Sequence, residues 1–489
     1  MKQSSTVLRL LARHSPIFLV VLLCGAATSG GTAWILTATA LTLAACLIYI
    51  FRVSALELLV VTIPVTFYTE VGVLTVNVTL SDFFFAIVAV QLFGNQEVRS
   101  IASRYTASLK IAVAATSSLI VICLGTIWTR SVLGLATDWI GFFSNTLKLI
   151  FVIALFAVAL VSSAGLKKET MHRLLTMWST TAAVVGAVGA TGSILYPLGI
   201  DIGMSYDFRA TATFEDPNAF ASYLLLSIPI CLLARHLSGR HLFCWQLVPL
   251  LAGVYTSYSR GAFVALVIMA VGLLILSLGD PKLLSLRIFS VAMAAAAVWL
   301  LFSGALESLF EDTRGAGFGS DGRFVLWSAA WELWKSSPIF GIGMGQFVNG
   351  AAAFIDHGAE GVIAHNTYLS MLAETGLAGF ALFMLIPVRA AGVLCRDMGT
   401  GSRLLLGSLL SVMTMAASLN LQNSRSLWVL LAISFASVEI KRNDDSSEPQ
   451  LTHGASRNVA TKWPLHIKHK LSDIGLVEDS SQWNQHSES

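Results

Sequence analysis

The chain has 489 residues, of which 55% are hydrophobic and only 12% are charged, and its net charge is +3. Soluble domains average roughly 45–50% apolar and about 25% charged residues. Together with a mean hydropathy of +0.73, this composition excludes a soluble globular protein, because so few charges could not cover so much apolar surface. The small net charge also argues against nucleic acid as a partner. We therefore predict an all-α, polytopic membrane protein in a lipid bilayer.

Apolar stretches long enough to span a membrane recur along the chain. A spanning helix needs about 20 such residues, and the pattern predicts about 12–14 transmembrane helices. The candidate spans lie near residues 15–29, 32–51, 54–69, 80–95, 107–127, 143–164, 173–196, 217–234, 241–258, 261–279, 284–303, 372–394, 403–420 and 425–440. The first follows Lys2, Arg9 and Arg13 as in a signal peptide, but a second apolar run comes almost at once, so we expect an uncleaved helix.

Lys and Arg gather in alternate connections between these spans. The positive-inside rule then predicts both termini in the cytoplasm and the remaining connections on the outer side. One outer connection, 304–364, is long and contains the aromatic, amphipathic stretch Phe324–Trp334, which we expect to form a helix at the membrane surface. The chain accordingly divides into N-terminal spans (1–200), a second membrane region that includes the long loop (201–440), and a cytoplasmic tail (441–489) expected to be disordered.

Several cations fall on the predicted outer side, where such residues should be scarce. Each arginine there could anchor the membrane interface by snorkelling, or it could bind an anion, since guanidinium holds phosphate bidentately and keeps its charge. Small neighbours, Gly261 and Ala262, favour anion binding at Arg260, and for Arg425 both interpretations stay open. Several arginines around one diphosphate would make a reasonable site. These outer cations are Arg209, Arg260, Arg314, Arg323, His365 and Arg425.

Two polar segments lead into spans from the same side. In Asp216-Pro217-Asn218 the first two residues are typical of a helix N-terminus, and Asn218 either belongs to that turn or faces an outer cavity as a substrate ligand. His365 is a candidate base near neutral pH or, when protonated, a phosphate ligand, and Asn366 beside it is a candidate substrate ligand. Glu374 would lie about 13 Å further along a helix, either at the interface or inside the membrane edge. Inside the membrane an ionisable residue needs a partner and marks function, so Glu374 is a candidate substrate ligand.

Motifs for metal binding are missing from the predicted membrane part. It contains no Asp-x-Asp pair, no Cys/His metal spacing, no Gly-rich phosphate loop and no Gly-x-Ser-x-Gly elbow. We therefore predict no metal and no other cofactor, with arginines neutralising any diphosphate. The six cysteines lie in or beside apolar segments without a C-x-x-C pair, so we expect buried thiols.

Four motifs, in this order, resemble the superfamily of O-antigen ligases and polymerases over about residues 200–440. They are R-x(4)-F-x-D-P-N-A-F (209–220), S-R-G-A (259–262), G-R-F-x-x-W (322–327) with P-I-F-G-I-G-M-G-Q-F (338–347), and A-H-N-T-Y-L (364–369) with E-T-G-L-A-G (374–379). The resemblance implies a metal-independent glycosyltransferase at the outer face of the bacterial inner (plasma) membrane, using glycans carried on undecaprenyl diphosphate. It also implies that Arg260 and Arg323, and more loosely Arg209, contact the diphosphate, with His365 near the acceptor.

Polymerases, which extend lipid-linked repeats, and ligases, which transfer the glycan to the lipid A core, share these motifs. Ligases often have Asn, Thr or Tyr where this chain has Gly379, and this departure favours a polymerase of O-antigen, capsule or exopolysaccharide repeats. Such an enzyme would work beside a flippase and a chain-length regulator. A flippase is the rival function, but it should show two related halves and mid-membrane charges, whereas the unusual cations here gather on one side, with Lys148 as the exception.

Overall fold

The computed structural model describes residues 53–66, 68–71, 76–93, 105–241, 244–302, 320–352, 354 and 363–447. The predicted spans near 15–29 and 32–51, and the outer cation Arg314, lie outside the described residues. The chain divides into two compact units, Met1–Arg442 and Asn443–Ser489, and the description below concerns the first.

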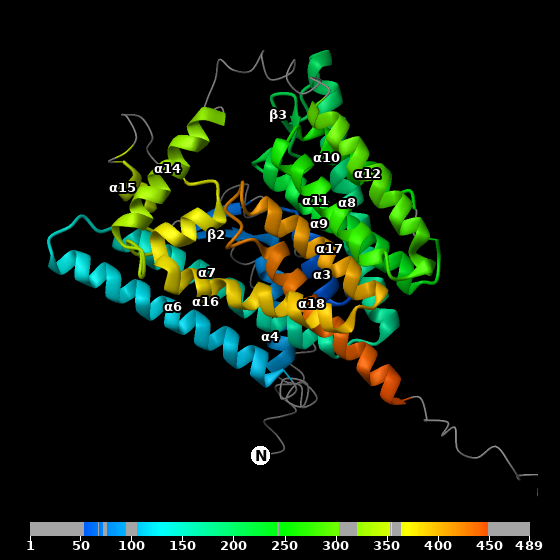
Figure 1. Cartoon of the computed structure of the whole chain (residues 1–489), viewed down its shortest axis with the longest axis horizontal. Coiled ribbons are helices and arrows are strands. Elements are labelled where there is room, and N and C mark those ends of the chain that lie inside the picture. Colours follow the sequence, from blue (N-terminus) through cyan, green and yellow to red (C-terminus); the bar gives the residue numbers. More distant parts are fainter. Residues whose placement is uncertain are drawn as a thin grey trace, which may run out of the picture. The chain divides into compact units, whose positions relative to one another are not determined.

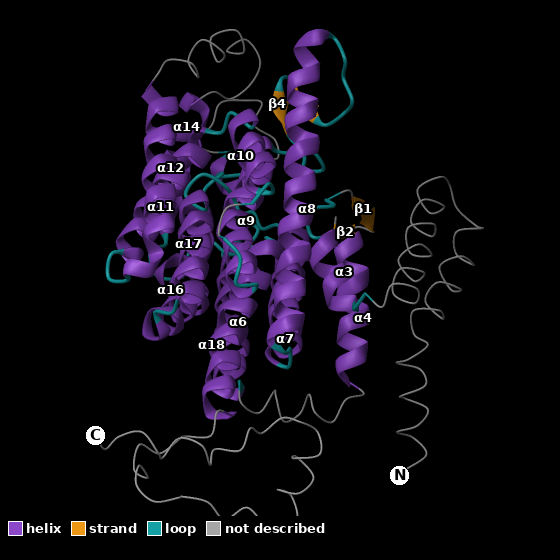
Figure 2. Cartoon of the chain, turned by 90° about the vertical axis from the view of Figure 1, so that its right-hand side faces the viewer, coloured by secondary structure: helices purple, strands orange, loops and turns teal. Residues whose placement is uncertain are grey.

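Helices make up most of the described structure, coloured along the chain in Figure 1 and by type in Figure 2. They are α3 (Ala55–Thr62), α4 (Leu80–Phe93), α6 (Thr106–Val132), α7 (Trp139–Ala164), α8 (Lys168–Leu195), α9 (Pro217–Leu237), α10 (Leu247–Thr256), α11 (Arg260–Ser277), α12 (Leu284–Phe302), α14 (Ser320–Ser336), α15 (Phe347–Ala351), α16 (Thr367–Asp397), α17 (Thr400–Met415) and α18 (Arg425–Ser447), with 3-10 turns η1 (Tyr196–Leu198) and η2 (Pro281–Leu283). Two small antiparallel hairpins pair β1 (Tyr68–Val71) with β2 (Val76–Thr79) and β3 (Ser205–Tyr206) with β4 (Arg209–Ala210).

The predicted all-α polytopic architecture is confirmed. Every predicted span from residue 54 onward overlaps a helix, and within the described ranges seven helices are long and apolar enough to cross a membrane. In Figure 2 the long helices run roughly parallel to one another. The seven are Ala107–Val132, Trp139–Ala164, Lys168–Leu198, Pro217–Leu237, Arg260–Ser277, Pro281–Phe302 and Thr367–Asp397.

Two predicted spans are much shorter helices than expected. Helix α10 has 10 residues, which cover about 15 Å of a hydrocarbon core about 30 Å thick. Helix α3 has only 8 residues, and Pro64, which lacks an amide hydrogen for a further helical bond, follows its C-cap Ile63. The chain beyond is held instead by Thr213, whose hydroxyl donates to the Pro64 carbonyl and whose carbonyl accepts from Thr66.

Four polar contacts link residues that are far apart in the chain. In each of them, both residues lie at helix ends or in loops that the charge pattern assigns to the same side of the membrane. This agreement supports the alternation of the spans, while the choice of which side is outer still rests on the Lys and Arg distribution. Two pairs join predicted inner ends, Arg173–Glu57 at 2.8 Å and Arg403–Asp280 at 3.5 Å, and two join predicted outer ends, Arg425–Asp82 at 2.7 Å and the Asp138 amide with Gln346 Oε1 at 2.8 Å.

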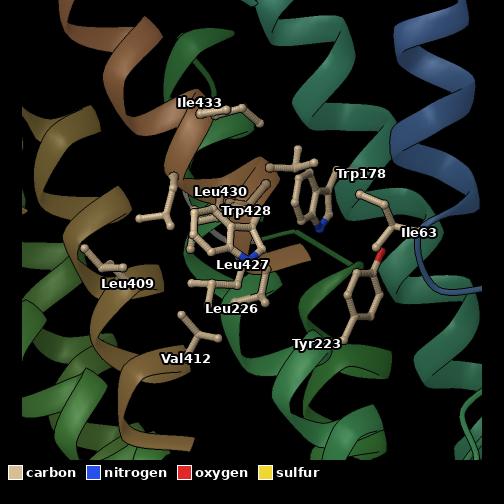
Figure 3. Close-up of a cluster of buried hydrophobic side chains, with 14 of the residues drawn as sticks. Ile63, Trp178, Tyr223, Leu226, Leu409, Val412, Leu427, Trp428, Leu430 and Ile433 are labelled. Atoms are coloured by element: carbon tan, nitrogen blue, oxygen red, sulfur yellow. The ribbon is translucent and has the colours of Figure 1, made fainter. Parts of the chain in front are cut away.

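Helix α9 lies at the centre of the core. In the most apolar 18-residue stretch of α9, 94% is buried, compared with 28% in the corresponding stretch of α6. Helix α9 is therefore enclosed by protein, whereas α6 leaves much of its surface for lipid. In α8, Trp178 stacks on Tyr223 of α9 with ring centroids 6.4 Å apart, and its indole nitrogen donates to Ser227 Oγ at 3.0 Å. Figure 3 shows Trp178 and Tyr223 beside Ile63, the C-cap of α3, with Trp428 of α18 in the same cluster.

Helix α16 is broken at Gly376, where φ is 64° and ψ is −171°. A broken helix leaves backbone groups without helical partners, and the loop 338–343 supplies them. A Cβ at Gly376 would lie 2.3 Å from the Ile339 carbonyl oxygen, so only glycine allows this approach. The bonds run from Ile342 N to Ala373 O (2.9 Å), Gly343 N to Glu374 O (2.8 Å), Leu377 N to Pro338 O (2.9 Å) and Ala378 N to Ile339 O (3.0 Å).

The long predicted outer loop contains the helix expected there, α14, which packs against α16. At the chain's other end, α18 continues to Ser447, past the start of the tail predicted at residue 441. The expectation of buried thiols holds for Cys123 and Cys231 and is wrong for Cys395, which is exposed. Cys244 is partly buried, and Cys24 and Cys46 lie outside the described residues.

Candidate functional site

Arg209 and Asn218 form one polar network on the predicted outer side. Arg209, at the start of β4, donates through Nε to the Ser257 carbonyl oxygen at 3.0 Å, and its Nη2 lies 3.4 Å from Asn218 Oδ1. The same amide oxygen accepts from Ser259 Oγ at 2.7 Å. Asn218, buried in the first turn of α9, therefore connects the arginine of the β3–β4 hairpin with the start of α11.

Helix α11 begins inside this network. Ser259 is its N-cap and accepts the Ala262 amide at 3.2 Å, which leaves Arg260 exposed at the first helical position. A Cβ at Gly261 would meet Ser418 Oγ at 2.6 Å, so the glycine allows the segment after α17 to approach α11.

His365 has a left-handed backbone, with φ at 47°. This conformation is unfavourable for a residue with a side chain, and contacts on both sides hold it. Trp327 Nε1 of α14 donates to the Ala364 carbonyl oxygen at 3.1 Å, and the Asn366 amide donates to Asn420 Oδ1 at 3.0 Å. The histidine is thus held between α14 and the connection from α17 to α18.

The rest of the His-Asn-Thr motif anchors the same connection. The side-chain oxygen of Asn366 caps α16 by accepting the amides of Tyr368 at 3.0 Å and Leu369 at 3.1 Å. Thr367 Oγ1 donates to the Leu419 carbonyl at 2.6 Å and accepts the Leu421 amide at 2.8 Å. The side-chain oxygen of Asn366, a residue predicted to bind substrate, is therefore already engaged in capping.

Arg323 and Asp216 influence the pKa values of both His365 and Arg209. The pKa of His365 is lowered from 6.5 by burial and then by the positive charge of Arg323, while Asp216 acts in the opposite direction. Burial also lowers the pKa of Arg209, on which Asp216 and Arg323 act in opposite senses. Because such influence fades over about 10 Å in salt, the fold brings together residues that are far apart in the sequence.

Four of the five described non-glycine residues with positive φ lie in the three segments that carry Arg209, Arg260 and the histidine. They are Asp207 (54°), Ala212 (49°), Tyr258 (48°) and His365 (47°), while the fifth, Met398 (47°), is the C-cap of α16. Strained non-glycine residues persist where the surroundings determine them, and they cluster at functional sites.

Two predicted site residues are engaged elsewhere. Glu374 accepts the Phe347 amide at 3.1 Å and so holds the start of α15. Arg425 forms a bidentate pair with Asp82, through Nε to Oδ1 and Nη2 to Oδ2 at 2.7 Å each, and its guanidinium lies 5.5 Å from the Phe151 ring centroid. Both side chains thus have structural roles that require no substrate.

The sequence analysis missed Asn420 and gave no role to Trp327. Asn420 opens a polar run, Asn420–Ser424, between two apolar spans, and that run was the signal that could have drawn attention to it. Among the described residues, no three His, Cys, Asp or Glu side chains gather where they could hold a metal ion.

Comparison with known families bears on this arrangement. Residues 245–384 match the family model described as O-antigen ligase, a range that includes Arg260, Arg323 and His365 and stops before Asn420. A comparison with curated proteins finds no match for the chain. The matched range runs from the start of the α10 segment into α16, and so it covers the long loop and the strained histidine. With its several membrane-length apolar helices, this chain is a multi-pass bacterial membrane protein with a region, residues 245–384, that is similar to the O-antigen ligase family.

Proposed function

We propose that this chain is a metal-independent membrane glycosyltransferase that polymerises undecaprenyl diphosphate-linked oligosaccharide repeats into a surface polysaccharide. The observation that carries the proposal is the hydrogen bond of Trp327, one turn after Arg323 in α14, to Ala364 beside His365. In agreement with it, the positive charge of Arg323 lowers the pKa values of His365 and Arg209. Arg260 begins α11 in the network that holds Arg209. Cations and one potential base in a single cluster are what transfer from a diphosphate requires.

The arginines are suited to the donor. Guanidinium stays charged and binds phosphate oxygens bidentately, so it can stabilise the departing undecaprenyl diphosphate without a metal. The exposed Arg260 also stands at a helix N-terminus, where the backbone N–H groups and the helix dipole favour an anion.

His365 is suited to the acceptor. Its lowered pKa keeps the imidazole neutral near pH 7, which supports a role as base over a role as phosphate ligand. In the proposed step the acceptor hydroxyl oxygen bonds to the anomeric carbon of the donor glycan, and the bond from that carbon to the diphosphate oxygen breaks. The hydroxyl proton passes to His365, and the electron pair leaves with the diphosphate held by the arginines.

Gly379 supports a polymerase. A Cβ at this position would lie 2.3 Å from Thr375 Cβ and 2.7 Å from Leu119 Cδ1, so the larger side chains frequent in ligases do not fit here. A ligase that transfers the glycan to the lipid A core is the second candidate, because the matched family is described as O-antigen ligase. The products separate the two: a ladder of glycans on the lipid carrier for a polymerase, and a glycan on the lipid A core for a ligase.

Reconstitution in liposomes with lipid-linked repeats tests the proposal. The wild-type protein should lengthen the glycan and release undecaprenyl diphosphate, whereas a flippase would move the lipid without consuming it. Arg260→Ala should lower transfer about 10- to 100-fold through the lost phosphate contact, and Arg260→Lys should recover only part of it. Arg240→Ala, at an exposed arginine on the predicted inner side, should have no effect. Full activity of Arg260→Ala would contradict this assignment.

The proposal also requires an orientation. We propose that the protein lies in the bacterial inner membrane with both termini in the cytoplasm and the arginine cluster outside, where a flippase would deliver the donor and a chain-length regulator would act. A reporter fused after Glu311 should be active only outside the cytoplasm. Activity confined to the cytoplasm would overturn the orientation and with it the supply of substrate.

A further inference from the structure

Helix α14 carries four aromatic residues along one flank. At 3.6 residues per turn they fall within about 80° of the helix circumference. The buried face, made of Leu326, Ala329, Ala330 and Leu333, lies beside them, and Arg323 falls between the two. The aromatic flank therefore continues the side of the helix that bears a residue of the candidate site. These four residues, the aromatic track, are Phe324, Trp327, Trp331 and Trp334.

The rings of the aromatic track are held in place. Trp327 Nε1 donates to the Ala364 carbonyl, and Trp334 Nε1 donates to the Pro338 carbonyl, each at 3.1 Å. Phe324 packs edge-on to Trp327 with centroids 5.5 Å apart, and Trp331 lies 4.5 Å from Trp334. Phe324 and Trp331 are nonetheless 64% and 45% exposed. Rigid, exposed rings bind a ligand with little loss of conformational entropy.

We infer that the aromatic track binds sugar rings of the acceptor oligosaccharide beside the reaction centre. The inference rests on the proposed function. The track reaches Trp327, whose partner Ala364 immediately precedes His365, so an acceptor with its hydroxyl at the histidine would extend along α14. The negative face of an aromatic ring attracts the positive C–H face of a sugar, while the sugar hydroxyls remain at the edge in water.

Membrane anchoring is the other role such a helix could have. Interfacial tryptophans usually direct the indole N–H toward water and lipid headgroups. Here the N–H groups of Trp327 and Trp334 are both used by backbone carbonyls within the loop. This observation, and the continuity of the track with Arg323, favour a glycan over a lipid surface.

Trp331 is the position to vary, because its ring is exposed and lies two turns along α14 from Phe324. In proteoliposomes, Trp331→Ala should raise KM for the acceptor about three- to tenfold with little change in kcat. Trp331→Phe, which keeps a ring, should stay close to wild type. Val325→Ala is the matched control, since Val325 is equally exposed (46%) on the other flank.

Binding can be measured apart from the arginines. The oligosaccharide released by mild acid from the host's own lipid-linked repeat lacks the diphosphate, and it should quench the tryptophan fluorescence of the full-length protein saturably. The affinity should fall by the same three- to tenfold in Trp331→Ala. If the oligosaccharide binds but the protein transfers no glycan, the result would support sugar binding by the aromatic track and would contradict the proposed transferase function.

Three results would overturn the inference. One is an unchanged acceptor KM in Trp331→Ala while Arg323→Ala abolishes transfer. A second is an equal effect of Val325→Ala. The third concerns the fluorescence of Trp331 itself, obtained as the difference between wild type and Trp331→Phe. If lipids with brominated acyl chains quench this Trp331 fluorescence, and added oligosaccharide does not prevent the quenching, Trp331 is a membrane anchor.

Discussion

The backbone amide of Asn366 donates a hydrogen bond to Oδ1 of Asn420 at 3.0 Å, directly after the left-handed residue His365. Asn420 lies in the connection between α17 and α18, far along the chain from the histidine motif. With the Trp327 bond to Ala364 on the other side, it fixes a backbone conformation that costs about 1–3 kcal/mol in a non-glycine residue. The geometry of the candidate base therefore depends on two residues outside its own segment.

Asn420→Ala should lower kcat about 10- to 100-fold, because it leaves a buried amide unsatisfied and lets His365 move. The KM for the donor should change less, since the arginines remain. Steady-state kinetics in proteoliposomes would check this. Asn145→Ala removes an asparagine hydrogen bond of similar length (2.9 Å) from α7 and should leave transfer unchanged. If Asn420→Ala and Asn145→Ala showed the same kinetics, Asn420 would have no role in positioning His365.

The pH dependence of transfer should report His365. A base must be deprotonated, so kcat/KM should rise with pH to a plateau, with a midpoint below 6.5 because burial and Arg323 lower the pKa. Arg323→Gln removes the nearby positive charge and should move the midpoint to higher pH, in addition to slowing transfer. Lys335→Gln, on the exposed side of the same helix, should not move it.

His365→Ala should lower kcat by about 10²–10⁴-fold while donor binding changes less, as expected for loss of a general base. Binding of the lipid-linked donor to the variant, measured without acceptor, separates the alternatives. A collapse of donor binding would make His365 a phosphate ligand, and Glu215 would become the better candidate for the base, because Glu374 already accepts the Phe347 amide.

Arg425 should matter for stability and not for chemistry. Its side chain and that of its partner Asp82 are only 23% and 14% exposed, so Arg425→Gln leaves a largely enclosed carboxylate without its counter-charge. We expect a loss of about 1–3 kcal/mol in thermal unfolding, and Asp82→Asn in the same chain should restore part of it. Transfer per folded molecule should stay at the wild-type level. A loss of donor affinity without a loss of stability would instead show that Arg425 binds the substrate.

The break in α16 offers a matched pair of glycine variants. Gly376→Ala should destabilise the protein by more than about 2 kcal/mol, because its φ is 64° and a Cβ would overlap the Ile339 carbonyl. Gly392→Ala, in the same helix with open space around it, should be neutral or slightly stabilising. Thermal unfolding of the two purified variants would check the contrast, and similar melting temperatures would show that the break is not required.

The polytopic helical architecture was predictable from composition and from the recurrence of apolar runs, because the bilayer imposes helix length and internal hydrogen bonding. The sequence also predicted which helix ends share a side. It could not predict that α3 and α10 would be short, because the lengths of half-buried helices depend on the protein packed around them, as with the pairing of Pro64 and Thr213.

The candidate site divides in the same way. Arg209, Arg260, Arg323 and His365 could be selected from the sequence by itself, because cations on the predicted outer side contradict a strong compositional rule. Only the tertiary structure decided which of the polar residues already have partners: Arg425 with Asp82, Glu374 with Phe347, and Asn366 with its own helix. It also revealed Asn420 and the role of Trp327. Hydrogen-bond partners far apart in the chain leave no periodic signal, because they are set by how helices pack and not by the local pattern along any one of them.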